Sequence, residues 1–418
     1  MPLTSYADTL RTAIALGAAL PAATETVPLA DAAGRVVAED VAVPISLPPF
    51  DGSAMDGYAV RAADTAGASA DAPVVLRLVE ESRAGHPSAA VVGPGEATRI
   101  STGARMPAGA DAVIRVEDTD ERTDADGGAG VAVRVAVDPG HDVRPAGEDV
   151  TAGDRAVAAG ELLHPGRLAL LAGLGVTTVA VRRAPSVTVI ATGDEVRVGG
   201  GPLADGEVHD VHGTALPALL RAAGAGAVDV VRVGDDRQAT IDAFAAAAGD
   251  VIVSCGGVSV GRHDHVRPAL DALGATEAVF GVDLQPGKPT WIGEANVAGR
   301  RRVIFGLPGN PASAYVTACL FVASALRAML GRPDAPTTVG RLAEDTRPDG
   351  RRTRALRARL HVTDDGTLGV RPLGPQHSHR LRPLADGEVL ALLPAGDGPL
   401  PAGTTVRLVP IPGTSAPW

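Results

Sequence analysis

Strand-like apolar runs alternate with helix-like runs between residues 185 and 330, and few folds can accommodate such an alternation. The strand-like runs are 187–191, 228–233, 251–254 and 303–306, and the helix-like runs are 214–223, 236–248, 264–273 and 311–329. Repeated β-α units of this length predict a doubly wound, three-layer α/β domain, in which a parallel sheet carries helices on both faces. In such a domain ligands bind beyond the carboxyl ends of the strands.

The segments on either side of this region have different patterns. Residues 5–20 predict an amphipathic helix that begins with a capping box of Ser5 and Asp8. Short β-type runs predict a β-rich domain in the N-terminal half and a small β domain at the C-terminus. We predict four domains: an N-terminal domain of residues 1–45 plus 143–180, an inserted β-rich domain of residues 46–142, the α/β domain of residues 181–331, and a C-terminal domain of residues 332–418.

Charge and cysteine content exclude several classes of protein. A formal net charge of -11 at pH 7 argues against a nucleic-acid binder or a protein of anionic membranes, so local groups must hold any anionic ligand. Cys255 and Cys319 cannot form a disulfide framework, and we interpret both as buried. The apolar stretch 168–181 is too short and too rich in glycine to span a bilayer. These features predict a cytoplasmic protein.

Three turn-rich segments follow the strand-like runs and are therefore expected at one edge of the sheet. They are Thr192–Glu195, Ser254–Asp264 and Leu307–Ser313. Glycines such as Gly256, Gly257 and Gly261 allow backbone amides to converge on an anion, which suits a phosphate. Glu195 and Asp264 add carboxylates, which are ligands that Mg²⁺ prefers. The pattern favours a phosphate ester or nucleotide held together with a divalent cation.

The one lysine of the chain, Lys288, enters the same region within the turn Gln285–Pro289. All 37 other basic residues are arginines, since Lys and Arg together number 38. A lysine is a compact, strongly hydrated point charge, whereas arginine is a planar fork, so the two are not interchangeable at a tight anion site. We therefore expect Lys288 to bind an oxyanion.

Each of these residues also has a purely structural interpretation. The glycines could form a tight strand-to-helix turn, Asp264 could cap the following helix, and Glu195 and Lys288 could be solvated surface groups. A zinc hydrolase is a further alternative, because histidines and a carboxylate gather in two short stretches. The candidate zinc ligands are His209, His212, His263, His265 and Asp264.

The N-terminal half contains further polar motifs. Phe50–Val60 surrounds Asp56 with turn residues, and its apolar side chains suggest an exposed ligand platform or subunit contact. Ser101–Ala104 supplies the Thr102 hydroxyl, and Arg144–Asp149 supplies a guanidinium and two carboxylates. Their spacing alone assigns them no function.

Taken in order, these motifs resemble those of the molybdopterin molybdenumtransferases, the family of bacterial MoeA and the E domain of gephyrin. The resemblance extends from Ser5 to at least Ser313. Its motifs are Ser53–Ala59, Ser101–Ala104, Arg144–Asp149, Thr192–Glu195, Gly256–Gly261 with Asp264, Pro286–Pro289 and Leu307–Ser313. The resemblance implies a helical N-terminal domain, the β-rich insertion, a molybdopterin-binding α/β domain and a C-terminal β-barrel, assembled as a homodimer.

The resemblance also implies a reaction, in which molybdate is inserted into adenylated molybdopterin in a Mg²⁺-dependent step that releases AMP. Glu195 and Asp264 would hold the metal and the adenylate, and Ser259 and Lys288 would face molybdate or phosphate. Asp56, Thr102 and Asp149 would close the site from the partner subunit. The other implied substrate-binding residues are Arg144, Thr192, Gly193, Gly256, Gly257, Gly261, Pro308, Gly309, Asn310 and Ser313. Further implied partners are the molybdopterin adenylyltransferase and molybdoenzymes.

The chain departs from the family pattern at several positions. Gln285 stands where many relatives carry lysine, and Asp210-Val211-His212 replaces a frequent Asp-Ser-Asn. The C-terminal Gly-Ser and Ser-Leu patterns appear as Gln376–His379 and Pro383-Leu384, and a Gly-Arg-x-x-Phe-x-Arg pattern survives only loosely within Arg351–Arg357. A non-catalytic molybdopterin-binding or scaffold protein of the same fold is therefore the alternative.

Overall fold

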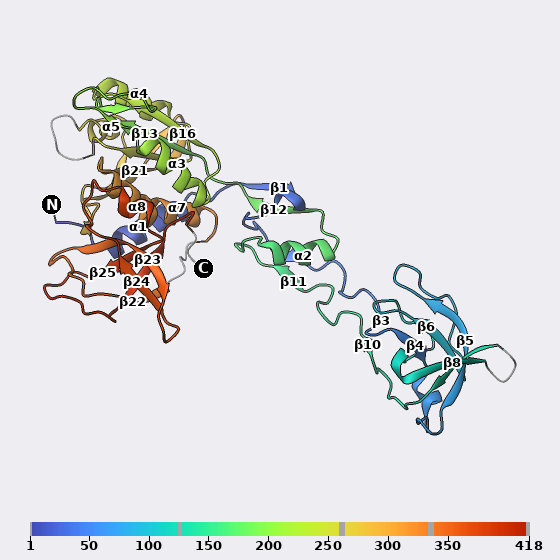
Figure 1. Ribbon diagram of the computed structural model, residues 1–418. Helices are drawn as coiled ribbons and strands as arrows, with labels where there is room; N and C mark the ends of the chain where they lie inside the picture. Colours follow the sequence, from blue (N-terminus) through green and yellow to red (C-terminus); the bar gives the residue numbers. More distant parts are fainter. Residues whose placement is uncertain (1, 124–127, 259–263, 333–337, 415–418) are drawn as a thin grey trace. The chain divides into compact units, whose positions relative to one another are not determined.

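The computed structural model describes residues 2–123, 128–258, 264–332 and 338–414. The chain forms two compact units (Figure 1). Unit 1 comprises Met1–Thr26, Gly160–Leu162 and Ala180–Trp418, and unit 2 comprises Val27–Ala159 and Leu163–Val179. The chain passes from one unit to the other in β1 (Thr24–Pro28) and β12 (Thr178–Arg182), which pair as a two-stranded sheet.

A six-stranded sheet of order β16-β13-β17-β21-β20-β18 forms the centre of unit 1. Its strands are β13 (Val187–Thr192), β16 (Val228–Val233), β17 (Val251–Cys255), β18 (Thr276–Phe280), β20 (Trp291–Val297) and β21 (Arg300–Leu307). The first three strands and β21 are parallel, as the sequence predicts, but β20 runs antiparallel to β21 and β18 antiparallel to β20. The sheet is thus mixed rather than purely parallel.

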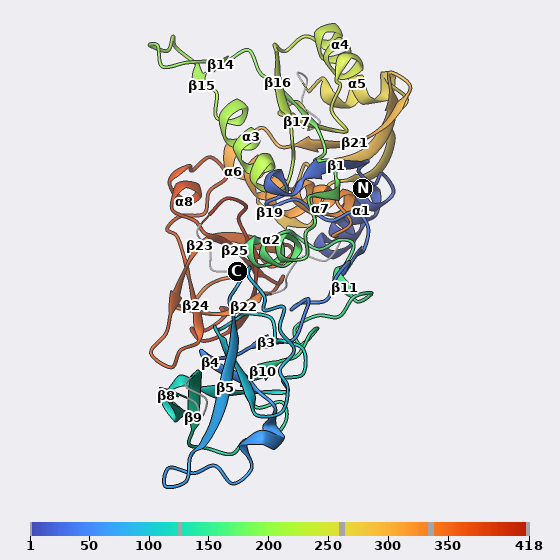
Figure 2. The same ribbon diagram turned by 90° about the vertical axis from the view of Figure 1, so that its right-hand side faces the viewer.

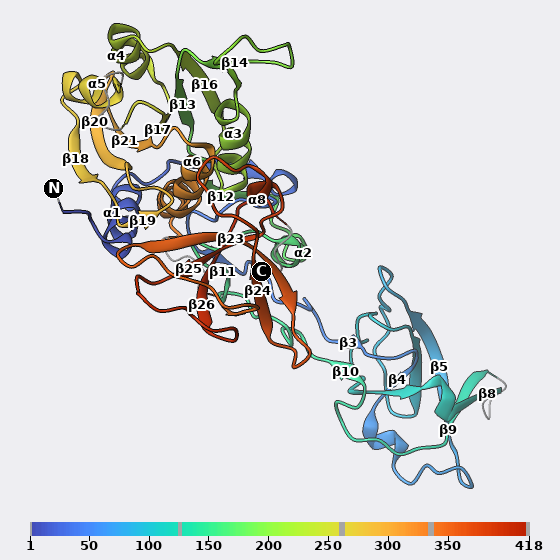
Figure 3. The same ribbon diagram turned by 60° about the vertical axis from the view of Figure 1, so that its left-hand side comes forward.

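Helices cover both faces of this sheet, which confirms the predicted three-layer α/β architecture (Figure 3). On one face lie α1 (Tyr6–Ala18), α3 (His212–Ala222), α6 (Pro311–Thr317) and α7 (Ala323–Met329), and on the other lie α4 (Arg237–Ala246) and α5 (Val266–Ala272). Strand residues alternate between the faces: Val251 and Val253 pack in the first layer, whereas Ile252 packs against Phe244 in the second. This two-residue period follows from the strand pleat.

The N-terminal helix α1 occupies a position different from the predicted one. We expected it to join residues 143–180 in a separate domain, but it belongs to unit 1 and packs on α7. Its apolar face, including Tyr6 and Ala13, enters the core that also contains Phe321. A Cβ atom at Gly17 would lie 2.3 Å from the carbonyl oxygen of Ala325, so glycine permits the two helix backbones to approach closely. Helical periodicity identified the helix but not the surface that it covers.

The segment Pro311–Met329 is a continuous helical stretch, with a π-helical turn η4 (Ala318–Val322) between α6 and α7. Its length and its mean hydropathy of 1.4 over an 18-residue window would suffice to cross a membrane. However, 83% of that window is buried inside the protein, as in the core helix of an α/β domain. We therefore interpret it as a core helix.

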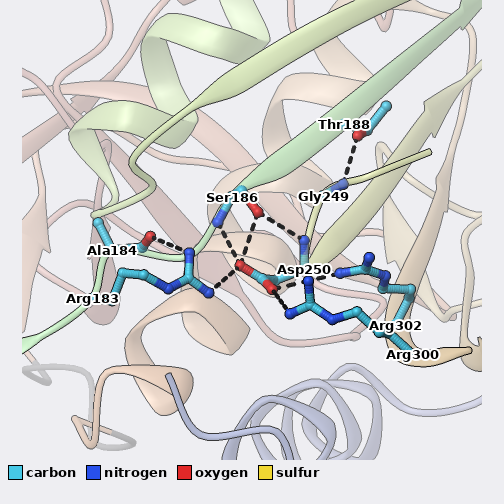
Figure 4. Close-up of polar contacts among 8 residues, drawn as sticks. All are labelled: Arg183, Ala184, Ser186, Thr188, Gly249, Asp250, Arg300 and Arg302. Atoms are coloured by element: carbon cyan, nitrogen blue, oxygen red, sulfur yellow. Dashed lines mark hydrogen bonds and ion pairs between the residues drawn. The ribbon is translucent and has the colours of Figure 1, made fainter. Parts of the chain in front are cut away.

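A buried aspartate lies at the amino-terminal ends of the central strands (Figure 4). Asp250, which is 6% exposed, accepts hydrogen bonds from the Ser186 backbone N–H at 2.9 Å and the Ser186 hydroxyl at 2.8 Å. Its carboxylate also contacts the guanidinium groups of Arg183 at 2.9 Å, Arg300 at 3.2 Å and Arg302 at 3.5 Å. These contacts tie together the starts of β13, β17 and β21.

The C-terminal part of unit 1 is a β-barrel, as expected from the family resemblance (Figure 2). Its strands are β22 (Thr338–Leu342), β23 (Thr353–Val362), β24 (Leu368–Pro372), β25 (Val389–Leu393) and β26 (Thr405–Pro410). They follow the order β23-β24-β22-β26-β25, and the pairing of β23 with β25 closes the barrel. Strand β19 (Leu284–Gln285) extends this sheet beside β23 and brings the Lys288 turn next to the barrel. The short helix α8 (Arg382–Ala385) precedes β25.

Unit 2 contains a six-stranded sheet of order β7-β4-β6-β5-β9-β8. The strands are β4 (Gly57–Val60), β5 (Val74–Ser82), β6 (Glu96–Ile100), β7 (Ala112–Arg115), β8 (Thr119–Thr123) and β9 (Ala129–Val133). Shorter elements complete the unit: β2 (Val41–Ala42), β3 (Gly52–Ser53), β10 (Val143–Arg144), β11 (Arg155–Val157) and α2 (Pro165–Gly173). The predicted β-rich character is present, and the division of unit 2 into two domains stays a prediction.

One exposed aromatic that the sequence suggested is in fact buried. The Tyr58 side chain is 1% exposed, lies in the core of the unit 2 sheet, and donates its hydroxyl to Glu121 at 2.9 Å. Phe50, by contrast, is 37% exposed, as expected. Tyr58 is buried because its ring packs in the same apolar core as Val60, Leu76 and Ile114.

Candidate active site

Three turn-rich segments leave the unit 1 sheet at the same edge, as the sequence predicts. Ala191 of β13 pairs with Cys255 of β17, which pairs with Leu307 of β21, so the chain emerges from all three strands at one level. Thr192, Gly256 and Pro308 follow immediately and line a single cavity of about 1050 Å³. We call it the glycine-loop cavity. Its volume is sufficient for a nucleotide-sized ligand.

The glycine-loop cavity collects most of the predicted site residues. Those that line it are Thr192, Gly193, Glu195, Gly256, Gly257, Asp264, Pro308, Gly309 and Asn310. The predicted residues Ser259 and Gly261 lie outside the described residues. The glycine at position 256 is sterically required: its φ is +91°, and a Cβ there would lie 2.6 Å from the Thr192 hydroxyl oxygen. The first two loops can therefore approach each other only with glycine at this position.

Two residues of the Asp210-Val211-His212 segment make polar contacts beside the cavity. The imidazole of His212, at the start of α3, lies 2.8 Å from the backbone oxygen of Gly309 and so connects α3 to the third loop. The Asp210 carboxylate accepts hydrogen bonds from Gly213 N–H at 2.7 Å and from the Arg232 guanidinium at 2.8 Å. These contacts give the Asp210-Val211-His212 departure a structural role beside the cavity.

The zinc alternative receives no support from this geometry. His212 is engaged with Gly309, and within the ranges that the structure describes no three His, Cys, Asp or Glu side chains gather as metal ligands. His263 lies outside the described residues. Burial, followed by the charge of Asp210, raises the pKa of the Cys255 thiol, so this cysteine is a neutral, buried group rather than a nucleophile.

Lys288 lies in a second, smaller cavity of about 430 Å³ rather than in the glycine-loop cavity itself. The two cavities share Pro289 and Asn310 as lining residues, so they adjoin. Lys288 is joined there by Arg352 and Arg354 at the start of β23, and by the predicted Ser313. We call this the cationic cavity, because three basic side chains and no carboxylate are among its described lining residues.

Sequence patterns did not predict the two arginines of the cationic cavity. The signal that could have identified them is the density of arginine within Arg351–Arg357, which fits the family pattern only loosely. Strand pairing makes their contribution possible, because Gln285 of β19 lies beside Arg354 of β23. Asp349 lies 3.0 Å from Arg352 and positions it. Backbone N–H groups and the Arg352 guanidinium hold the pKa of Asp349 below its usual range.

The remaining predicted residues belong to unit 2. Asp56 accepts hydrogen bonds from the Thr102 backbone N–H at 2.7 Å and from its hydroxyl at 3.0 Å, and these bonds lower the pKa of Asp56. Arg144 lies in β10, which pairs with β3, and the Asp149 N–H donates to the Leu47 carbonyl. The structure thus brings Asp56 and Thr102 into direct contact. Their role in a partner's site stays a prediction.

Three family models match the chain in succession. The MoeA N-terminal region (domain I and II) matches residues 4–175, a probable molybdopterin-binding domain matches residues 188–328, and the MoeA C-terminal region (domain IV) matches residues 339–411. A molybdopterin molybdenumtransferase 2 of Mycobacterium tuberculosis is 39% identical over 394 residues, which cover 92% of this chain and 94% of the relative. The chain belongs to the MoeA family.

Other MoeA-family proteins support the same assignment. The molybdopterin molybdenumtransferase of Bacillus subtilis is 33% identical over 402 residues, covering 94% of this chain and 92% of that protein. A crystal structure of a molybdopterin biosynthesis MoeA protein from Pyrococcus horikoshii aligns with a TM-score of 0.83 at 32% identity, over 99% of this chain and 100% of that one. The MoeA fold therefore extends over both units.

Proposed function

We propose that this MoeA-family protein is a molybdopterin molybdenumtransferase, which inserts molybdate into adenylated molybdopterin and releases AMP. Its named relatives match it over nearly their whole length. The observation that carries the proposal is the presence of two adjoining cavities with complementary chemistry. The larger one is lined by glycine loops and carboxylates, and the smaller one by Lys288, Arg352 and Arg354.

Each cavity suits one substrate. Backbone amides at glycine-rich turns bind phosphate oxygens, so the adenylate of the organic substrate would occupy the glycine-loop cavity. Three cationic side chains suit a tetrahedral dianion, so molybdate would occupy the cationic cavity. Because the two cavities share Pro289 and Asn310 as lining residues, substrates bound in them would lie next to each other. Such a site acts through positioning and electrostatics and requires no protein nucleophile.

We propose Mg²⁺ as the metal of the glycine-loop cavity, with Glu195 and Asp264 as its protein ligands. Mg²⁺ keeps several waters and binds through one or two carboxylates together with substrate phosphates. Glu195 and Asp264, two of the carboxylates that line this cavity, match that donor set. When bound, the ion would neutralise charge on the phosphoryl oxygens. We further propose a cytoplasmic homodimer in which Asp56, Thr102 and Asp149 of one subunit complete the site of the other.

The test is AMP release from adenylated molybdopterin by the purified protein, with Mg²⁺ and molybdate supplied. We expect release that requires all three components. Asp264→Ala should abolish release with an unchanged thermal unfolding midpoint, whereas Asp205→Ala, which removes an exposed loop carboxylate, should retain it. Binding of the adenylated substrate without AMP release would instead identify a non-catalytic binding protein.

A further inference from the structure

A long turn projects from unit 1 beside the glycine-loop cavity. It connects β14 (Val196–Arg197) to β15 (Val208–His209), and residues 198–206 between them are exposed and form no helix or strand. Figure 2 shows this segment, which we call the arm, extending away from the sheet and its helices. The arm contains none of the residues assigned above to phosphate or metal.

The base of the arm is held by polar contacts. The Glu207 carboxylate accepts hydrogen bonds from the Arg197 guanidinium at 2.6 Å and from the Ala204 N–H at 2.8 Å. The Arg197 guanidinium also donates to the Asp194 carbonyl at 2.8 Å, one residue before the proposed metal ligand Glu195. These contacts connect the end of the arm to the loop that follows β13, so this end has a defined position.

The beginning of the arm is a run of three glycines in open space. A Cβ atom at Gly199, Gly200 or Gly201 would meet no atom within 4 Å in the described parts of the chain, apart from its own neighbours. Glycine has more backbone freedom than any other residue, and packing does not restrict it here. The arm can therefore change conformation at these glycines while the Glu207 contacts hold its base.

The arm also brings apolar side chains to the cavity. Leu203 is 40% exposed and lines the glycine-loop cavity, as do Val196 and Val208 at the base of the arm. Leu381, from the C-terminal part of unit 1, is 45% exposed and lines the same cavity. Exposed apolar side chains gathered around one cavity are typical of a ligand surface. Because the glycine loops and carboxylates suit phosphate and metal, these apolar groups suit the flat face of an organic ring.

We propose that the arm closes over a heterocyclic ring of the organic substrate, and that Leu203 is the specificity-determining residue that contacts this ring. The inference rests on the proposed function, because adenylated molybdopterin carries two such rings, the adenine and the pterin. Contact with the ring removes the apolar surface of Leu203 from water, which favours the closed arrangement. The three glycines supply the freedom of movement that closure requires.

Millisecond hydrogen exchange of the full-length protein tests closure without turnover. AMP with Mg²⁺ should slow exchange in residues 198–206 if the arm contacts adenine, and only the adenylated substrate should slow it if the arm contacts the pterin. Pyrophosphate with Mg²⁺ supplies phosphate groups without a ring and should leave the arm unchanged. Slower exchange with pyrophosphate, or unchanged exchange with both organic ligands, would refute the inference even if AMP release is normal. A protected arm without AMP release would instead contradict only the proposed turnover.

The variant that tests the residue is Leu203→Asn, which makes an exposed apolar side chain polar and should leave the unfolding midpoint unchanged. The KM for the adenylated substrate should rise by about 10-fold, while the KM for molybdate stays within about 2-fold. Leu203→Met should restore most of the loss. Val198→Asn is the matched control on the same arm, because Val198 is 65% exposed and is not among the described lining residues. A wild-type KM in Leu203→Asn, or an equal rise in both variants, would remove Leu203 from substrate recognition.

Discussion

The ammonium of Lys288 is distinguished by its surroundings rather than by burial. It is exposed, yet it lines the cationic cavity beside Arg352 and Arg354. A lysine would present a tetrahedral anion with a small point charge, whereas a third guanidinium would compete with Arg352 and Arg354 for the same oxygens. The identity of this side chain, not just its charge, should therefore affect the use of molybdate.

We predict that Lys288→Arg raises the KM for molybdate by about 5-fold or more, with little change in the KM for the adenylated substrate, because the guanidinium is larger and less mobile than the ammonium. Steady-state AMP release at varied molybdate concentration measures the change. Arg371→Lys, an exchange of the same kind at an exposed position, is the control. A wild-type molybdate response would return Lys288 to the status of an ordinary surface lysine.

At the scale of elements, sequence patterns identified many helices and strands but not the elements against which they pack or pair. The β-α alternation predicted β13, β16, β17 and β21 and the edge at which their loops meet, because each strand contains several β-branched apolar residues. It did not identify β18 and β20, whose pairing is antiparallel. Arg352 and Arg354 were missed for a related reason. Only the pairing of β19 with β23, two distant segments, brings them beside Lys288.

The contact between α1 and α7 provides a test in which two physical effects have opposite signs. Helix propensity alone predicts that Gly17→Ala stabilises α1 by about 1 kcal/mol. Because a Cβ at this position would meet the Ala325 backbone at 2.3 Å, we expect instead a net loss of about 1–3 kcal/mol. Denaturant unfolding followed by circular dichroism gives the sign. Ala15→Gly, at an exposed position of α1, is the control for propensity alone.

The Asp250 cluster provides a second test at this scale. We expect Asp250→Asn to lower the free energy of unfolding of unit 1 by about 3–5 kcal/mol, since it leaves the buried Arg302 without its anion. Arg300→Gln removes a contact whose arginine is 63% exposed and should cost less than about 1 kcal/mol. Urea unfolding at pH 7 measures both. Equal losses in the two variants would mean that the burial of Arg302 has no special importance.

The same carboxylate predicts a pH dependence. Although burial opposes ionisation, hydrogen bonds from Ser186 and the Arg183 guanidinium lower the pKa of Asp250 below its usual value. A depressed pKa contributes stability that is fully present above the unfolded-state value of about 3.9 and is lost as pH falls through the folded value. The stability difference between wild type and Asp250→Asn should thus be constant near neutrality and shrink below about pH 4. A difference that grows towards acid pH would contradict this assignment.

At the scale of the whole molecule, unit 2 is an insertion into unit 1. The chain leaves unit 1 at Thr26 and returns to it for good at Ala180. The Arg183 N–H donates to the Ala23 carbonyl at 2.7 Å, so the two crossing points are adjacent. Adjacent ends are typical of inserted domains that can be removed without unfolding the host.

We predict that replacing residues 24–182 by a short glycine linker yields a unit 1 that unfolds cooperatively and still shows a molybdate-induced rise in unfolding midpoint. It should release no AMP if Asp56, Thr102 and Asp149 of unit 2 are needed for turnover. Differential scanning calorimetry and the AMP assay give the two readouts. Full AMP release by the shortened protein would remove unit 2 from the reaction.

The strand register described above has a consequence for the loops. Val187, Val251 and Val303 stand in one row near the Asp250 cluster, and Ala191, Cys255 and Leu307 stand in another row where the loops begin. The three strands have the same number of residues between these two rows. Their relative positions at the Asp250 end therefore also fix where the loops begin at the carboxyl ends. The ion pairs of Asp250 at one end of the sheet therefore help to set the relative positions of the loops at the other end.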